Sequence, residues 1–129
     1  MATRRLVPAV SSVAELVGYS RAVRVGDHVF VAGTAPIMPG DADPPADSYG
    51  QARRCLEIVV AALAEVGARP EHVVRTRLYL TSEDHFEGAG RAHGEVFGDV
   101  RPATAAVVVA ALIDPRWLVE IEADAIVSG

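Results

Sequence analysis

Residues 104–113 read Thr-Ala-Ala-Val-Val-Val-Ala-Ala-Leu-Ile, and this uncharged stretch decides the fold class. It has no alternation of apolar and polar residues, so both faces of the element that it forms must be shielded from water. The run of valines, with Pro102 and Pro115 at its two ends, favours a strand. We therefore predict a strand over Thr104–Ile113 that is buried on two sides.

A strand that is buried on two sides needs other elements to cover both of its faces, and this chain is short. Among its 129 residues, only two segments show the spacing of an amphipathic helix. Two helices can cover one face of a sheet, and the other face then needs a partner subunit. We therefore expect a homo-oligomer with a site at its interface.

Composition predicts one compact domain over residues 1–129. Hydrophobic residues make up 50% of the chain, yet no apolar run reaches the ~18 residues of a membrane span. The sequence has no signal-peptide pattern, and its single cysteine fits a reducing cytoplasm. The net charge of −5 and the absence of lysine argue against a nucleic-acid partner.

Hydrophobic spacing predicts the order strand, strand, helix, strand, helix, strand, strand, which is an α+β architecture. A further strand is expected near residues 5–8. The expected elements are a hairpin over 23–32 turning at Gly26–Asp27, an exposed loop over 36–47, a helix over 48–67, a strand over 73–80, a helix over 84–97, the strand over 104–113 and a last strand over 117–127.

Two local patterns within the helices carry further predictions. Ser48 and Gln51 have the spacing of a capping box at the start of the first helix. The glycine-rich segment Gly88–Gly94 looks like a phosphate loop, but it lies inside a helical pattern and does not follow a strand. We therefore attribute its glycines to close packing rather than to nucleotide binding.

The histidines and the cysteine give no support for a metal or a cofactor. The spacing of His28, His72, His85 and His93 matches no metal-ligand motif. His93 lies on the apolar side of the second helix, where a core or interface role is favoured over a catalytic one. Cys55 lies on the apolar stripe of the first helix, where a thiol is usually inert rather than a nucleophile.

Three carboxylates, Glu120, Glu122 and Asp124, alternate along the last strand and therefore share one face. A solvated sheet face explains this pattern without any function. Alternatively, one carboxylate lines a cleft, where burial raises its pKa and suits it to proton transfer. The sequence alone does not separate these two interpretations.

Several motifs, in the same order along the chain, resemble the RidA/YjgF/UK114 family. The matching segments are Tyr19–Val23, Gly26–Gly33, Glu71–Thr76, Phe97–Gly98, Arg101–Ala103 and Val119–Ala123. The resemblance implies a chorismate-mutase-like α+β fold with two helices on one face of a mixed sheet. It also implies a homotrimer with small-molecule pockets between its subunits, and we place Tyr19, Gly33, Thr34, His93, Thr104 and Glu120 in that pocket.

The best-known members of this family hydrolyse 2-imino acids or enamines to 2-oxo acids and ammonia. In them, an arginine after the Pro-Ala dipeptide binds the substrate carboxylate, and a glutamate of the last strand assists the attacking water. Glu120 matches the glutamate, whereas Thr104 stands in place of the arginine. A neutral hydroxyl cannot replace a bidentate guanidinium, so the chain resembles a divergent subgroup with an altered substrate preference. Arg75, Arg77, Arg91 and Arg101 are the candidates for a replacement cation.

The sequence leaves two functions open, and a third is least favoured. The first is a deaminase-type hydrolase of imines, enamines or related carbonyl derivatives, in which Glu120 is the catalytic residue. The second is a non-catalytic ligand-binding or regulatory trimer that keeps the pocket. An endoribonuclease activity fits least, because the chain is acidic and lacks lysine.

Overall fold

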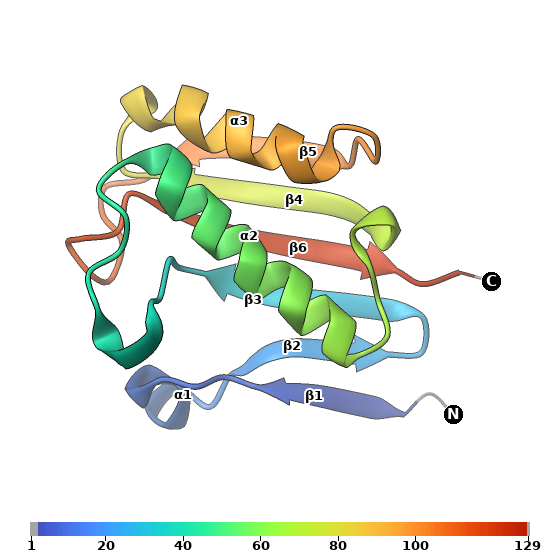
Figure 1. Ribbon diagram of the computed structural model, residues 1–129. Coiled ribbons are helices and arrows are strands. Elements are labelled where there is room, and N and C mark those ends of the chain that lie inside the picture. Colours follow the sequence, from blue (N-terminus) through green and yellow to red (C-terminus); the bar gives the residue numbers. More distant parts are fainter. Residues whose placement is uncertain (1–2, 129) are drawn as a thin grey trace.

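The computed structural model describes residues 3–128, which fold into one mixed sheet with helices (Figure 1). The strands are β1 (Arg4–Pro8), β2 (Ser20–Val25), β3 (His28–Thr34), β4 (Val73–Leu80), β5 (Ala103–Val108) and β6 (Val119–Ile126). The helices are α1 (Ser12–Val17), α2 (Ser48–Glu65) and α3 (Phe86–Phe97), and short 3₁₀ turns span Pro39–Asp41, Pro70–His72 and Glu83–His85.

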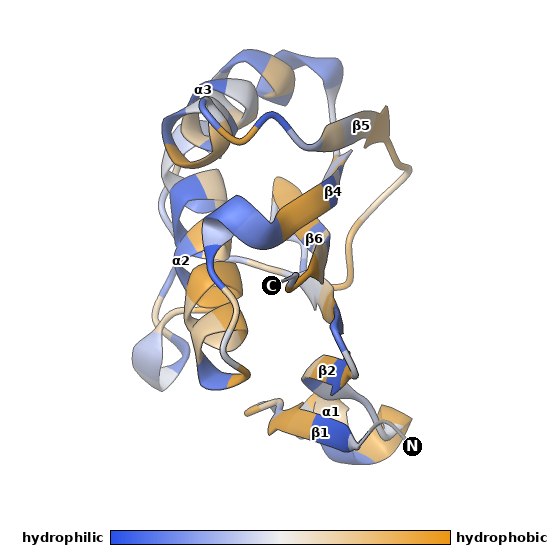
Figure 2. Ribbon diagram, turned by 90° about the vertical axis from the view of Figure 1, so that its right-hand side faces the viewer, coloured by the Kyte–Doolittle hydropathy of each residue, from blue (hydrophilic) through white to orange (hydrophobic). Residues whose placement is uncertain are grey.

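The sheet has the strand order β1-β2-β3-β6-β4-β5, with β4 and β5 parallel and the other pairs antiparallel. Both long helices, α2 and α3, cover the same face of this sheet and leave the opposite face without a long helix, while the short helix α1 lies beside β1 at the sheet edge (Figure 2). The predicted α+β class, with two helices on one face of a mixed sheet, is therefore confirmed. We call the uncovered side the open face.

Alternation along β6 explains how the core forms. Val119, Ile121, Ala123 and Ala125 are buried, and the residues between them are partly exposed, as the sequence predicts. The buried residues face α2, whose stripe of Cys55, Leu56, Val59 and Leu63 is also buried. Full burial of such Leu, Ile and Val side chains contributes roughly 1.5–3 kcal/mol each. This packing fixes Glu120, Glu122 and Asp124 on the open face.

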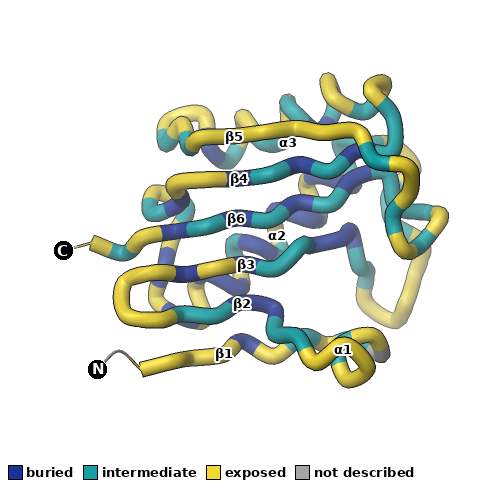
Figure 3. The backbone as a smooth tube through the Cα atoms, turned by 180° about the vertical axis from the view of Figure 1, so that it is seen from behind, coloured by how far each residue is buried: buried dark blue, intermediate teal, exposed yellow. Residues whose placement is uncertain are grey.

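The strand expected to be buried on two sides is instead the exposed edge of the sheet (Figure 3). All six residues of β5 are largely outside the core, with Val107 at 47% exposure and Val108 at 57%, and the strand ends at Val108 rather than Ile113. Within the single chain, the prediction of two-sided burial is wrong. The cause is the position of β5, which pairs with β4 on one side and with no described strand on the other.

The first turn of α2 differs from the predicted capping box. The N-cap is Asp47, whose Oδ1 accepts from the backbone N–H of Gly50, while Ser48 is already the first helical residue. Asp47 can do this because its extended backbone precedes the helix and its side chain points back at the free N–H groups. The side chain of Gln51 is therefore free to form contacts outside the helix.

Other elements differ in detail from the sequence prediction. The short helix α1 is absent from the predicted elements, because its apolar residues Val13, Leu16 and Val17 remain exposed and follow no core-facing stripe. In β4, a register irregularity between Val73 and Arg75 turns Val74 outward, although alternation places it on the same face as Thr76.

Close packing explains only one of the three glycines in Gly88–Gly94. A Cβ at Gly88 would collide with Ser48 and Tyr49 at the start of α2, whereas Gly90 and Gly94 face open space. The segment lies inside α3, so it is not a phosphate loop.

No described helix is long and apolar enough to cross a membrane. Within residues 3–128, no group of three or more His, Cys, Asp or Glu side chains is arranged to hold a metal ion.

Candidate functional site

The three carboxylates of β6 have different partners on the open face. Arg77 of β4 forms ion pairs with Glu122 at 3.2 Å and with Asp124 at 3.6 Å. Tyr79 Oη also donates to Glu122 Oε1 at 2.6 Å. By contrast, Glu120 makes no hydrogen bond or ion pair with any described residue. Glu120 is therefore the carboxylate of this face that is free to bind a ligand or a proton.

Burial changes the acidity of Glu120. The side chain is half-buried, and this desolvation raises the pKa of its carboxyl group. The positive charge of Arg21 opposes that rise, and the negative charge of Glu122 adds to it. A carboxyl group with a raised pKa is suited to general acid–base chemistry near neutral pH.

Gly33 makes room for this carboxylate. A Cβ at position 33 would lie 2.6 Å from Glu120 Oε2, closer than van der Waals contact allows. The pairing of β3 with β6 is irregular between Val31 and Thr34, so the Gly33 backbone is displaced from the regular ladder. The next residue, Thr34, is fully buried, and its hydroxyl donates to the carbonyl of Ala32 at 2.7 Å. Thr34 thus supports the bend of the strand, and the Gly33 backbone lies against Glu120.

Arg21 is a residue of this site that sequence reasoning missed. It lies on β2 and is only 9% exposed. Its Nη2 donates to the carbonyl of Gly33 at 2.6 Å, while its Nε is buried and has no acceptor among the described residues. Burial lowers the pKa of the guanidinium, and the nearby Tyr19 and Glu120 favour its charged form. A buried cation with an unused donor is costly, which marks this position as unusual.

Tyr19 lies beside Arg21 just before β2. The guanidinium carbon of Arg21 lies 5.7 Å from the centre of the Tyr19 ring, and Tyr19 Oη is 3.3 Å from Ser11 Oγ. Tyr19, Arg21, Gly33 and Glu120 therefore form one group of neighbours, which we call the Glu120 cluster.

Thr104 and His93 belong to a second group, on the helix-covered side of the sheet. Thr76 Oγ1 lies 2.8 Å from His93 Nε2 and 2.8 Å from Thr104 Oγ1, so one buried hydroxyl links the two residues. His93 also packs against Phe97, with ring centres 4.8 Å apart, and burial lowers its pKa. At neutral pH this histidine is therefore uncharged and joins the exposed edge strand to α3.

The register of the sheet keeps the two groups apart within one chain. Thr104 pairs with Thr76, whereas Glu120 pairs with Tyr79, and the two sites lie on opposite faces. Three residues along a strand and two strand spacings correspond to roughly 14 Å between the Cα atoms. A single small ligand does not span this separation, so a shared pocket would need residues from two subunits.

Three of the four arginines considered as a replacement for the missing cation, Arg77, Arg91 and Arg101, contact other residues in the structure. Arg77 is held by Glu122 and Asp124. Arg91 lies over the Tyr49 ring at 4.3 Å, and Arg101 donates to the carbonyl of Gly98. Arg75 is exposed on β4. Arg21, which the sequence did not single out, lies beside Glu120.

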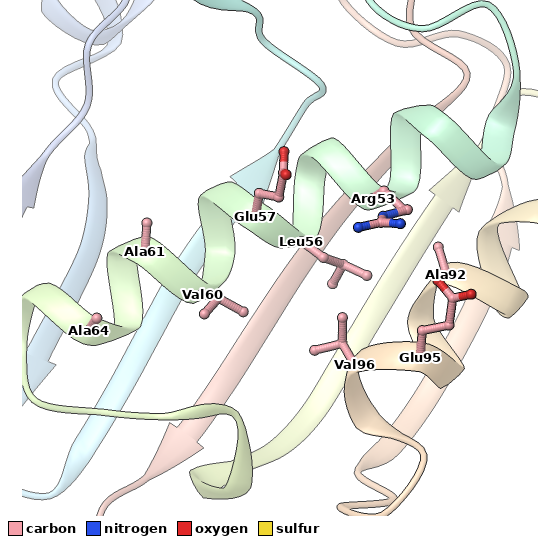
Figure 4. Close-up of a pocket in the computed structure, with 9 residues that line it drawn as sticks. All are labelled: Arg53, Leu56, Glu57, Val60, Ala61, Ala64, Ala92, Glu95 and Val96. Atoms are coloured by element: carbon pink, nitrogen blue, oxygen red, sulfur yellow. The ribbon is translucent and has the colours of Figure 1, made fainter.

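Two further features lie outside both groups. Cys55 is buried, its Sγ lies 3.8 Å from the carbonyl oxygen of Val119, and burial raises the pKa of its thiol, which fits the predicted inert role. A groove of about 620 Å³ lies between α2 and α3 (Figure 4). Small apolar side chains and the charged Arg53, Glu57 and Glu95 line it, and it contains none of the predicted site residues.

Known proteins show the same fold and sequence pattern. The family described as Endoribonuclease L-PSP matches residues 10–127. An uncharacterised protein of Streptomyces coelicolor is 41% identical over 115 residues, which cover 86% of this chain and 83% of that protein. A RutC family protein of Pyrococcus abyssi is 38% identical over 107 residues, covering 81% and 83% of the two chains.

A solved structure agrees with these matches. It is a member of the YjgF/YER057c/UK114 family from Mycobacterium tuberculosis, with 45% identity and a TM-score of 0.87, and the match covers 97% of this chain and 100% of that one. The resemblance seen in the sequence motifs is thereby confirmed, and the chain belongs to the RidA/YjgF/UK114 family, with its chorismate-mutase-like α+β fold.

Proposed function

We propose that this protein is a small-molecule hydrolase that converts imines, enamines or related derivatives into carbonyl compounds and ammonia. The observation that carries the proposal is Glu120, a half-buried carboxyl group with a raised pKa, which lies against Gly33 while its neighbours on β6 are held by Arg77. The reaction needs a group that both gives and accepts protons, and a carboxyl group with a raised pKa is suited to this role.

In the proposed reaction, water adds to the carbon of a C=N bond. Protonated Glu120 gives its proton to the imine nitrogen, and the resulting carboxylate accepts a proton from the attacking water, which yields a carbinolamine. Glu120 then gives this proton to the amine nitrogen and accepts the hydroxyl proton as the C–N bond breaks, so that ammonia leaves and a C=O bond remains. The overall balance is imine plus water giving carbonyl compound plus ammonia.

We also propose a cytoplasmic homotrimer with its pockets between subunits. The exposed Val107 and Val108 of β5 supply apolar surface that a partner would bury. Such an arrangement would allow Thr104 and His93 of one subunit to meet the Glu120 cluster of the next.

The test is hydrolysis of a panel of freshly generated imines derived from amino acids, followed by ammonia release. Glu120→Gln should abolish most of the rate above background, because the amide cannot exchange a proton. Glu122→Gln is the matched control, since it changes the next carboxylate on the same face and should leave most of the activity. Equal rates in Glu120→Gln and wild type would refute the catalytic role of Glu120.

The alternative is a non-catalytic ligand-binding or regulatory trimer. It would be supported if no imine of the panel were hydrolysed faster than in buffer while small ligands still bound at the Glu120 cluster. An endoribonuclease activity is the least favoured, because the chain has no lysine and a net charge of −5. Cleavage of a single-stranded RNA by wild type, but not by Glu120→Gln, would overturn that ranking.

A further inference from the structure

We propose that Arg21 is the anion-binding residue of this site and holds the carboxylate of a small ligand beside Glu120. The inference rests on the proposed function and deepens it, because it names the residue that selects an acidic substrate. It stands on the geometry of Arg21 itself, which can be tested by binding without any turnover.

The charge of Arg21 is poorly compensated within the chain. The residue is only 9% exposed, yet its described partners are the Gly33 carbonyl, which accepts from Nη2, and Tyr19, whose ring centre lies 5.7 Å from the guanidinium carbon. The Nε–H has no acceptor within the described part of the chain. A guanidinium has five N–H donors and is normally buried only with a carboxylate or several acceptors around it. Arg21 thus retains both charge and donor capacity.

The other charges of the open face are arranged differently. Arg77 is already neutralised by Glu122 and Asp124, and Tyr79 is bonded to Glu122. Glu120 is close enough to influence Arg21 but forms no ion pair with it. No described carboxylate is paired with Arg21, and a ligand carboxylate would supply the partner that this buried cation lacks.

The surroundings of Arg21 also limit the charge of the anion. One guanidinium matches the two oxygens of a carboxylate by a bidentate contact. A phosphate dianion would bring two negative charges into a site that already contains Glu120 and lies near Glu122. The single positive charge of Arg21 would then face more negative charge than it can balance. The site therefore favours a monoanion.

Binding of the anion should also change Glu120. The charged and titratable groups around Glu120 are Arg21 of β2, Glu122 of β6, Tyr79 of β4 and the buried Cys55 of α2. A carboxylate placed on Arg21 cancels the positive charge among them. Glu120 then takes up a proton when the ligand binds, and it becomes the acid that the imine nitrogen requires.

The experiment is calorimetric titration of the full chain with pyruvate and with its neutral isostere pyruvamide. We expect wild type to prefer pyruvate, and Arg21→Gln to lose at least about tenfold in pyruvate affinity while its affinity for pyruvamide is unchanged. Arg21→Lys keeps the charge and should lose less. Repeating the pyruvate titration in buffers of different ionisation enthalpy should show proton uptake that is absent in Glu120→Gln.

Arg24→Gln is the matched control. Arg24 lies on the same strand and donates to the carbonyls of Gly26 and Val66, so its loss affects structure without touching the Glu120 cluster. It should leave the preference for pyruvate unchanged.

Three results would overturn the inference: no preference for pyruvate in wild type, an unchanged preference in a folded Arg21→Gln variant, or tighter binding of inorganic phosphate than of pyruvate. Binding of pyruvate through Arg21 without imine hydrolysis would retain this inference and refute the hydrolase. Imine hydrolysis that is insensitive to Arg21→Gln would retain the hydrolase proposal and refute this inference.

Discussion

Replacement of Gln51 by leucine should destabilise the fold strongly, although the residue lies on a helix and takes part in no charge pair. Gln51 is 1% exposed. Its Nε2 donates to the carbonyls of Pro45 and Arg116, both at 2.9 Å, and its Oε1 accepts from the N–H of Leu118 at 2.7 Å. One side chain thereby ties the 36–47 loop and the segment before β6 to α2.

The expected magnitude follows from these three bonds. Each contributes about 1 kcal/mol net, and a buried N–H or C=O left without a partner costs about 1–3 kcal/mol. We therefore expect Gln51→Leu to lose about 3–5 kcal/mol of unfolding free energy. At an unfolding entropy of about 2.1 cal/mol/K per residue, a chain of 129 residues should lose roughly 11–18 °C in Tm.

The assay is thermal and urea unfolding followed by circular dichroism. Glu57→Gln on the same helix is the control, because its ion pair with Arg54 at 3.5 Å is exposed and should contribute less than about 0.5 kcal/mol. Gln51→Glu adds a second readout. Its carboxylate would face two carbonyl oxygens, which raises its pKa in the folded state, so the stability of this variant should be greater at low pH and fall as pH rises. A loss below about 1 kcal/mol in Gln51→Leu would refute the reasoning.

Three further predictions address the site and the assembly. Gly33→Ala should keep most of the stability, because the Glu120 carboxylate can move away from the new Cβ, but carbon-detected NMR titration should show the Glu120 pKa falling toward its ordinary value. Glu120→Gln should raise Tm at pH 7 and have less effect near pH 4, because a carboxyl group whose folded pKa is raised loses its stabilising contribution as pH rises and the neutral amide does not. A scanning-calorimetry series in which the Tm difference shows no trend with pH would contradict this. Val107→Asp should leave the single chain folded, since Val107 is 47% exposed, but light scattering should show that the proposed trimer dissociates; a wild-type monomer at micromolar concentration would end the trimer proposal.

Periodicity predicts those elements whose two faces meet different surroundings. β4 begins and ends at the predicted residues, 73 and 80, and β6 has the predicted alternation. Both strands lie inside the sheet, where α2 and α3 cover one face and polar residues occupy the other. Hydrophobic spacing therefore predicts these strands, because it distinguishes the side chains that face the helices from those on the polar face.

Hydrophobic patterning is wrong for β5, because the apolar sequence predicts burial on both faces whereas the single chain leaves this strand exposed. An apolar run predicts that its side chains are shielded from water, but it does not indicate whether the same chain or a partner subunit covers them. Gln51 shows a related limit. Its spacing from Ser48 suggests a local cap, whereas its partners are 6, 65 and 67 residues away along the chain, and no local pattern encodes such contacts.

The candidate site divides in the same way between what sequence can and cannot supply. Glu120 can be selected from sequence because alternation puts it on a face with two other carboxylates, and the family motif points to it. Arg21 cannot be selected from sequence, since a lone arginine in a strand of mixed composition has no distinguishing pattern. Its significance comes from its burial, its orphaned Nε and its position beside Glu120, which depend on the pairing of β2 with β3 and of β3 with β6. The loss of an arginine at position 104 therefore does not imply the loss of a cation at the site, because the sheet brings Arg21 of β2 to the side of Glu120.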